Sequence, residues 1–154
     1  MKDIRFLVMD VDGTLTDGKI YMGPDGEVCK AFHIKDGYGI GVMLPAMRVR
    51  PVIITGRKSV ILENRCREIG VTDIHQGISD KLGVLRRVTG DLKAVAFIGD
   101  DLNDLECMQS VKDAGGLVGC PADAARGVRE IADFIAPSAG GCGAVRDFIE
   151  WLND

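Results

Sequence analysis

The sequence predicts an α/β fold in which a Rossmann-like, mainly parallel sheet is flanked by helices. Short apolar runs typical of buried strands alternate with longer segments whose apolar residues recur at helical spacing. A Gly-Pro-Asp-Gly turn between two short runs adds a β-hairpin near the N-terminus. No linker, repeat or low-complexity stretch interrupts the pattern, so residues 1–154 are expected to form one domain.

The expected strands are runs that are mostly apolar or that lie between turn signals. The first run, IRFLVMD, ends in an acidic residue, and PVIIT ends in a hydroxyl. The predicted sheet strands are Ile4–Asp10, Pro51–Thr55, Asp73–His75, Ala94–Ile98, Gly116–Val118 and Asp133–Ile135, and the hairpin strands are Lys19–Met22 and Glu27–His33.

The expected helices lie between these strands. In the second of them Val60, Leu62 and Cys66 are expected to face inward, and Gly70 ends the helix. Glycines at positions 37, 39 and 41 weaken the first half of the first helix. The predicted helices are Asp36–Met47, Ser59–Ile69, Asp80–Val88, Leu102–Ser110, Ala122–Ile131 and Gly143–Leu152.

Composition excludes several classes of partner. The formal net charge of −4 argues against nucleic acid, since phosphate backbones require clustered Lys and Arg. No apolar run approaches the ~20 residues that span a bilayer, so no membrane partner is expected. The five cysteines are an odd set without a CxxC motif, which favours free thiols in a reducing cytoplasm.

Acidic residues follow two of the predicted strands. Asp10 and Asp12 follow the first, and Asp100 follows Ala94–Ile98, with Asp101 and Asp104 close behind. Carboxyl ends of parallel strands meet at one edge of a sheet, so these side chains should converge. Crowded carboxylates repel unless a cation compensates, and an all-oxygen set indicates Mg²⁺. Such acids can also simply cap turns, but two clusters after apolar strands favour the metal site.

The spacing Asp10-Val-Asp12 suits phosphoryl chemistry. One carboxylate can attack phosphorus, and the other can protonate the leaving alcohol and then activate water. Thr55 and Gly56 end another strand and could bind phosphate oxygens. Taken alone, that pair also fits a simple turn, and Lys81 also fits a solvated surface lysine.

The order of these motifs resembles the haloacid dehalogenase superfamily, whose four motifs match DVDGT, the Thr after a strand, the Lys and GDDxxD. The resemblance implies that Asp10 is the nucleophile and Asp12 the general acid/base, while Thr55 and Lys81 hold the phosphate. It further implies a Mg²⁺ site of Asp10, the backbone carbonyl of Asp12 and Asp100, supported by Asp101, Asn103 and Asp104.

Within that superfamily the chain resembles the 3-deoxy-D-manno-octulosonate 8-phosphate phosphatase family over nearly its whole length. The stretches LTDGKIYMGPDGE, FHIKDGYGI, IITGRK, ENRCREIG and GGCGAVRD occur in the same order. The resemblance implies a phosphatase without a cap domain, a phosphorylated sugar-acid substrate, a homotetramer and a role in lipopolysaccharide biosynthesis. Two positions depart from the family pattern: His33 replaces a frequent Asn, and Cys142 replaces a basic residue.

Three other functions stay open. One is a phosphatase for a nonulosonate 9-phosphate or another small phosphate ester, but related nonulosonate phosphatases tend to carry Glu after Thr-Gly, where this chain has Arg57. A catalytically inactive oligomerisation scaffold would be expected to lack Asp10, Asp12 or Lys81. A response-regulator-like domain also clusters acids with a lysine, but it predicts a five-fold β/α repeat without an early hairpin.

Two arginines are candidate substrate ligands. Arg57 could pair with the carboxylate of a sugar acid through two parallel hydrogen bonds, although it also fits a solvated arginine at a helix start. Arg146 follows a glycine-rich tail and could bring positive charge to a neighbouring subunit's site. The hairpin carries apolar residues, including Ile20, Met22 and Val28, that could pack on its own sheet or on another subunit, and the family resemblance implies that it forms the interface of a homotetramer.

Overall fold

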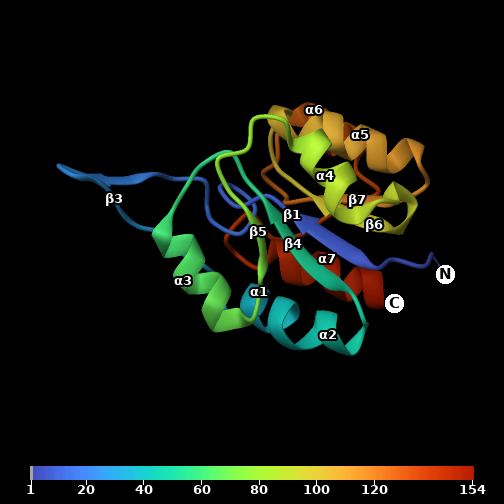
Figure 1. Cartoon of the computed structure of the whole chain (residues 1–154), viewed down its shortest axis with the longest axis horizontal. Coiled ribbons are helices and arrows are strands. Elements are labelled where there is room, and N and C mark those ends of the chain that lie inside the picture. The colour runs from blue at the N-terminus through green and yellow to red at the C-terminus, as the bar shows by residue number, and fades with distance from the viewer. Residues whose placement is uncertain (1) are drawn as a thin grey trace.

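A parallel sheet of six strands forms the centre of the computed structural model, which describes residues 2–154 (Figure 1). β1 (Phe6–Met9) lies between β4 (Arg50–Ile54) and β6 (Val95–Ile98), in the order β5-β4-β1-β6-β7-β8. All five neighbouring pairs are parallel, which confirms the predicted α/β class. The outer strands are β5 (Asp73–His75), β7 (Leu117–Cys120) and β8 (Phe134–Ile135).

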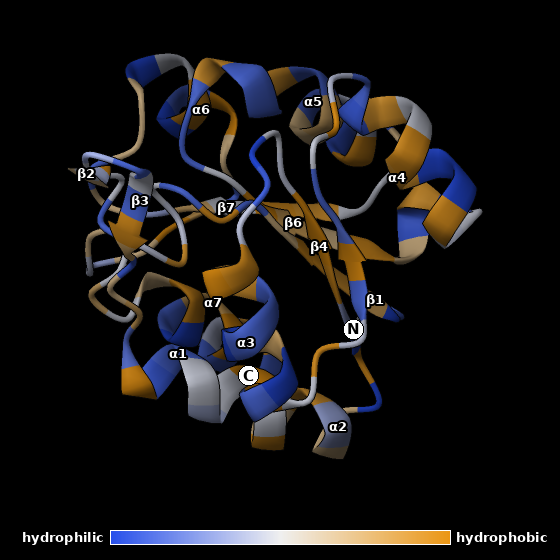
Figure 2. Cartoon of the chain, turned by 60° about the vertical axis from the view of Figure 1, so that its left-hand side comes forward, coloured by the Kyte–Doolittle hydropathy of each residue, from blue (hydrophilic) through white to orange (hydrophobic). Residues whose placement is uncertain are grey.

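Helices cover both faces of the sheet, with apolar strands sandwiched between them (Figure 2). Successive residues of β1 serve opposite layers, because side chains alternate along a strand: Leu7 and Met9 join one core and Val8 the other. One layer contains α1 (Ile34–Tyr38), α2 (Leu44–Ala46), α3 (Val60–Ile69) and α7 (Ala144–Asn153), and the other contains α4 (Lys81–Thr89), α5 (Leu105–Asp113) and α6 (Arg126–Ile131).

A two-stranded antiparallel hairpin projects from the body of the molecule (Figure 1). It consists of β2 (Tyr21–Gly23) and β3 (Gly26–Cys29), and in residues 2–154 it is the only regular element between β1 and α1. As predicted, the described residues contain a hairpin and no cap domain between β1 and α1. The hairpin also departs from the response-regulator pattern.

The predicted strand Glu27–His33 was too long, because β3 ends at Cys29. His33 belongs to the start of α1 instead, where its Nδ1 accepts the backbone N–H of Lys35 at 3.1 Å. Asparagine is a preferred residue for this capping position, and the His33 imidazole accepts a capping hydrogen bond of the same kind. The departure at His33 thus has a structural explanation.

The predicted helix Asp36–Met47 is one helical run with an interruption. A π-helical segment, η1 (Gly39–Met43), separates α1 from α2. A Cβ on Gly39 would lie 2.9 Å from Ile149 Cδ1, and one on Gly41 would lie 3.0 Å from the carbonyl oxygen of Ile69. The glycines therefore allow this run to pack closely against α7 and the end of α3.

Helix α3 shows which boundary signals were reliable. Ser59 caps its first turn by accepting the N–H of Leu62, and Gly70 ends it at φ +79°. Leu62 and Cys66, four residues apart, face the core as predicted. Val60 was wrongly placed: it is 68% exposed, because it lies on the opposite side of the first turn.

Smaller corrections concern helix starts. Leu102–Asp104 forms a 3-10 turn, η3, before α5, and Leu92–Ala94 forms another, η2, that the sequence pattern did not reveal. The predicted helix Ala122–Ile131 begins only at Arg126. Within the described part of the chain, no helix combines the length and the apolar character needed to cross a membrane.

Three aromatic side chains attach α7 to the edge of the sheet. Phe148 and Trp151 of α7 stack with Phe134 of β8, with ring centroids 5.2–5.9 Å apart. A Cβ on Gly119 of β7 would lie 2.7 Å from the Phe148 ring, so glycine allows the ring to approach the sheet. The last helix is therefore docked by aromatic packing.

Candidate active site

The strand order brings three predicted site residues to one edge of the sheet. Asp10 follows β1, Thr55 follows β4, and Asp100 comes two residues after the end of β6. Because β1 pairs with both β4 and β6, these residues extend from neighbouring carboxyl ends. Asp10 is 5% exposed and Thr55 is 3% exposed, so this edge of the sheet holds polar side chains shielded from solvent.

Lys81 lies beside Asp10 and is itself buried. It is the first residue of α4, and its Nζ is 3.3 Å from Asp10 Oδ1 and 3.0 Å from Asp104 Oδ1. Asp104 is fully buried, and its Oδ2 accepts the backbone N–H of Asp100 at 3.1 Å. Asp104 therefore orients both the lysine and the loop that carries Asp100.

Two further residues belong to the cluster but were not predicted as site residues. Thr14 Oγ1 donates a hydrogen bond to Asp100 Oδ1 at 2.9 Å. Gly13 has φ +91°, and a Cβ there would lie 2.0 Å from Asp100 Oδ2, so only glycine fits. The available signal was their place directly after the Asp-x-Asp pair.

The chemistry of the cluster fits a divalent cation. Oxygens of Asp10, Asp100 and Asp104 lie within 4.8 Å of one another. Burial and the charge of Asp104 raise the pKa of Asp10 well above its usual value, and burial, opposed by the Thr14 hydrogen bond, raises the pKa of Asp100 to about 6. Three crowded carboxylates with one lysine leave a surplus of negative charge that a cation would relieve.

The donor set also indicates which cation and which ligands. Burial alone would lower the pKa of Lys81, but the charges of Asp10 and Asp104 raise it, so the lysine is a cation. Both oxygens of Asp104 are already engaged. Asp10 and Asp100 remain as candidate ligands, and hard oxygen donors suit Mg²⁺.

Asp12 makes a contact that the sequence did not reveal. Its Oδ1 lies 2.6 Å from Nζ of Lys30, a lysine just beyond β3 and 18 residues further along the chain. The pairing depends on where the chain returns to the strand end after β3, so no local spacing could have shown it. Arg57 approaches the same group of charges, since its Nη2 lies 3.4 Å from Glu27 Oε2.

Other predicted residues do not place their side chains in the buried acidic cluster. Asp101 and Asn103 are exposed, and the Asp101 side chain caps the 3-10 turn through the N–H of Leu102. Gly56 is exposed directly after Thr55, and a Cβ there would make only an ordinary contact, 3.7 Å from the carbonyl oxygen of Ile78. Arg146 packs over Tyr38, with its guanidinium carbon 5.4 Å from the ring centroid, and bonds Glu150. The structure thus places Arg146 against α1 of its own chain.

The glycine-rich tail before α7 packs against the loop after β1. The N–H of Gly141 donates to the carbonyl oxygen of Thr14 at 3.2 Å. A Cβ on Gly140 would lie 1.9 Å from the carbonyl oxygen of Gly13. These glycines bring the tail against the backbone of the Asp-x-Asp loop, so the tail borders the site within one chain.

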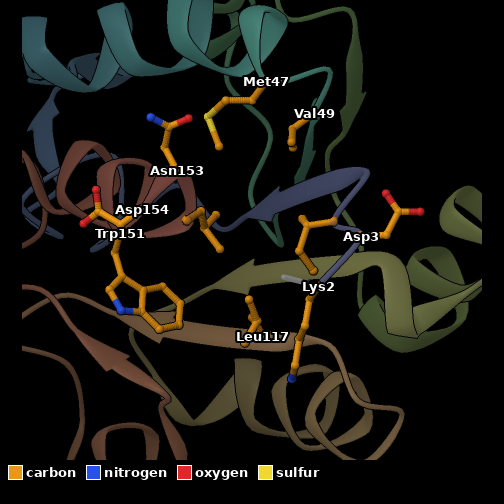
Figure 3. A pocket seen from close by; sticks show the side chains of 10 residues that line it. Lys2, Asp3, Met47, Val49, Leu117, Trp151, Asn153 and Asp154 are labelled. Carbon is orange, nitrogen blue, oxygen red and sulfur yellow. The ribbon is translucent and has the colours of Figure 1, made fainter.

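A cavity of about 520 Å³ lies at the opposite edge of the sheet (Figure 3). It opens beside the amino ends of the strands, far from the acids at their carboxyl ends. Its walls are largely apolar, and neither Asp10 nor Asp12 lines it. Ten residues line it: Lys2, Asp3, Ile4, Met47, Val49, Leu117, Trp151, Leu152, Asn153 and Asp154.

A parallel sheet with Asp-x-Asp after its central strand, a buried lysine and acids on the neighbouring strand end defines a haloacid dehalogenase-type phosphohydrolase. 3-Deoxy-D-manno-octulosonate 8-phosphate phosphatase KdsC of Escherichia coli K12 is 43% identical, over 98% of this chain and 80% of the relative. The chain belongs to the 3-deoxy-D-manno-octulosonate 8-phosphate phosphatase family.

Solved structures agree with this assignment. The Yersinia pestis 3-deoxy-D-manno-octulosonate 8-phosphate phosphatase has a TM-score of 0.88 at 39% identity, covering 98% of this chain and 81% of that one. The Moraxella catarrhalis enzyme, solved with magnesium, phosphate and KDO, has a TM-score of 0.90 at 36% identity, covering 98% and 86%. No family model matches the chain.

Proposed function

We propose that this chain hydrolyses 3-deoxy-D-manno-octulosonate 8-phosphate to the free sugar acid and inorganic phosphate. The observation that carries the proposal is the buried Asp10, paired with Lys81 and followed two residues later by Asp12. The relative that is 43% identical over 98% of the chain is named for this activity, which supports the same substrate here.

The proposed reaction has two displacements at phosphorus. In the first, a carboxylate oxygen of Asp10 bonds to phosphorus, the bond to the sugar oxygen breaks, and Asp12 gives its proton to that oxygen. In the second, Asp12 takes a proton from water, whose oxygen attacks phosphorus and breaks the bond to Asp10. Phosphate leaves, and both carboxyl groups return to their starting states.

The remaining candidates hold the substrate in this proposal. Thr55, Gly56 and Lys81 bind phosphate oxygens, and Arg57 pairs with the sugar-acid carboxylate. Mg²⁺ held by Asp10, Asp100 and the backbone carbonyl of Asp12 would neutralise part of the phosphate charge, so that an anionic Asp10 can approach it. Asp104 supports this arrangement through its contacts with Lys81 and with the Asp100 backbone.

Released phosphate, measured for a substrate panel with and without Mg²⁺, tests the proposal. We expect the highest kcat/KM for the eight-carbon keto-sugar phosphate, lower values for a nonulosonate 9-phosphate, and loss of activity after chelation with recovery on adding Mg²⁺. A higher kcat/KM for the nine-carbon acid would move the assignment to that substrate. No release from any member of the panel would overturn it.

The wider setting is also part of the proposal. We infer a single catalytic domain over residues 1–154 that works in the cytoplasm, in lipopolysaccharide biosynthesis, as a homotetramer. Buried free thiols at Cys66, Cys107 and Cys120 are consistent with a reducing compartment. Exposed apolar residues on the hairpin support assembly, and Arg146 of the tail helix would then lie close to an interface.

A further inference from the structure

Lys30 is a buried cation whose partners are both acids. Its side chain is 3% exposed, and Nζ lies 2.6 Å from Asp12 Oδ1 and 3.0 Å from Glu27 Oε2. Lysine is rarely buried unless paired, because removing its charge from water is costly. The carboxylates of Asp12 and Glu27 compensate that cost. The three side chains therefore hold one another in position.

Glu27 is held in turn by a second set of donors. Its Oε1 accepts a hydrogen bond from Ser59 Oγ at 2.8 Å, and its Oε2 lies 3.4 Å from Arg57. Ser59 is the N-cap of α3, a fixed point of the main body. Glu27 thus ties strand β3, and with it Lys30, to the start of α3. A two-stranded hairpin is marginally stable alone, so such ties are needed to fix its base.

One oxygen of Asp12 is used by this network and the other is available. Among the hydrogen bonds of residues 2–154, the Asp12 carboxylate accepts one from Lys30, through Oδ1. A carboxyl group protonated on Oδ2 still accepts that bond through Oδ1. The same contact can therefore hold Asp12 in both of its protonation states, and it leaves Oδ2 without a hydrogen bond among residues 2–154.

We propose that Lys30 is a positioning residue for the general acid/base Asp12, and that Glu27 holds Lys30 in place. The proposal rests on the proposed function, because it assigns Lys30 to the proton transfer that Asp12 performs. Proton transfer depends on placing the acid within hydrogen-bond reach of the leaving oxygen. A lysine that only anchored the hairpin would affect every substrate alike.

The test compares leaving groups. An alkoxide needs a proton as it leaves, whereas 4-nitrophenolate leaves without one, and kcat/KM reports the step that breaks the substrate's P–O bond. Three substrates serve: the keto-sugar 8-phosphate, glucose 6-phosphate as an alkyl phosphate without a carboxylate, and 4-nitrophenyl phosphate. The variants are Lys30→Gln, Lys30→Arg and Glu27→Gln. Lys19→Gln, an exposed lysine at the start of the hairpin, is the matched control.

Lys30→Gln is expected to lower kcat/KM on the order of tenfold to a hundredfold for both alkyl phosphates and less than about threefold for the aryl phosphate. Lys30→Arg should recover part of the loss, and Glu27→Gln should show the same pattern more weakly. Glu27→Gln also decides the matter if Lys30→Gln does not fold. Equal losses on all three substrates, or no loss, would overturn the role of Lys30. Phosphate release by the unchanged protein decides the proposed function separately.

Discussion

The carboxylate of Asp10 is surrounded by charges of both signs. Lys81 stabilises its ionised form, while Asp100 and Asp104 oppose it, and burial removes the water that would otherwise solvate it. The balance raises the pKa of Asp10 well above its usual value, and a bound cation would favour the ionised form. Such a site costs free energy of folding. It is useful to the reaction because the carboxylates can bind a metal ion and Lys81 can bind a phosphate.

Replacing Asp10 by asparagine should abolish turnover while leaving the fold intact. The amide cannot attack phosphorus and is a poor metal ligand, so we expect a loss on the order of a thousandfold or more in kcat. Removing one of three crowded acids should leave the protein at least as stable without Mg²⁺. Phosphate release and thermal unfolding measure the two effects. Appreciable activity in the pure, folded variant would exclude Asp10 as the nucleophile.

Arg57 offers a separate test of substrate recognition. It is 42% exposed at the side chain, and Glu27 is the acid it contacts, so its guanidinium is accessible to a ligand carboxylate. Arg57→Ala should lower kcat/KM by about tenfold or more for the keto-sugar phosphate, since a charge-assisted pair is lost, and leave glucose 6-phosphate nearly unchanged. Equal losses on both substrates would remove Arg57 from carboxylate recognition.

The sequence could predict those site residues whose position follows from topology. Asp10, Thr55 and Asp100 each follow a strand, and parallel strands align their carboxyl ends. Lys30 and Glu27 could not be predicted, because they lie on a hairpin whose angle to the sheet depends on tertiary packing. A motif records spacing along the chain, whereas these pairings depend on where a projecting element comes to rest.

At the scale of elements, Asp36 joins α1 to α7. One of its oxygens accepts the N–H of Arg146 in the first turn of α7, and the other is buried without a hydrogen-bond partner in residues 2–154. Burial raises the pKa of Asp36 to about 6. The carboxylate therefore favours the start of α7 electrostatically, but its ionisation in this setting costs free energy of folding.

The pH dependence of that cost follows from the raised pKa. Between pH 3.8 and about 6 the folded state holds a proton at Asp36 that the unfolded state has lost, so stability falls as pH rises through this window. Asp36→Asn removes the titration while keeping an acceptor for Arg146. From pH 4 to pH 7 its free energy of unfolding should improve relative to the unchanged protein by about 2 kcal/mol.

Urea unfolding at several pH values without Mg²⁺ measures this difference. Asp113→Asn, an exposed acid at the end of α5, is the matched control for the change in net charge. A difference between Asp36→Asn and the unchanged protein that stays constant from pH 4 to pH 7 would contradict the raised pKa.

Element boundaries were predictable where a residue type marks them. Ser59 and Gly70 enclose α3, as capping rules require. The π-helical segment was not predictable, because Gly39 and Gly41 read locally as weak helix formers. Glycine is needed at these two positions because Gly39 lies close to Ile149 and Gly41 lies close to the Ile69 carbonyl. Both contacts are with residues more than 25 positions away along the chain.

At the scale of the molecule, several of the exposed apolar residues lie on the hairpin and on α1. Met22 and Val28 of the hairpin are 63% and 61% exposed, and Ile34 of α1 is 81% exposed. An exposed apolar surface on a two-stranded hairpin is stabilised when it is buried against another protein surface. The expected homotetramer would use this surface, which the fold itself leaves uncovered.

Light scattering at micromolar concentration should give about four times the chain mass of 16.6 kDa. Replacing both Met22 and Val28 by Glu should produce smaller species, since charge at a buried interface is costly. Ile135→Glu, a change at an exposed apolar residue on the edge strand β8, is the control and should keep the tetramer. A fully active monomer would exclude any dependence of catalysis on assembly.

The aromatic stack on α7 gives the molecule an optical reporter of its own. Trp151 is the single tryptophan, and it lies against Phe134 and Phe148 at the cavity by the amino ends of the strands (Figure 3). Its fluorescence emission should therefore report whether α7 is packed against the sheet, and it should not change during the reaction at the acidic cluster. A change in Trp151 emission on adding substrate would mean that binding at the carboxyl ends of the strands alters the structure at their amino ends.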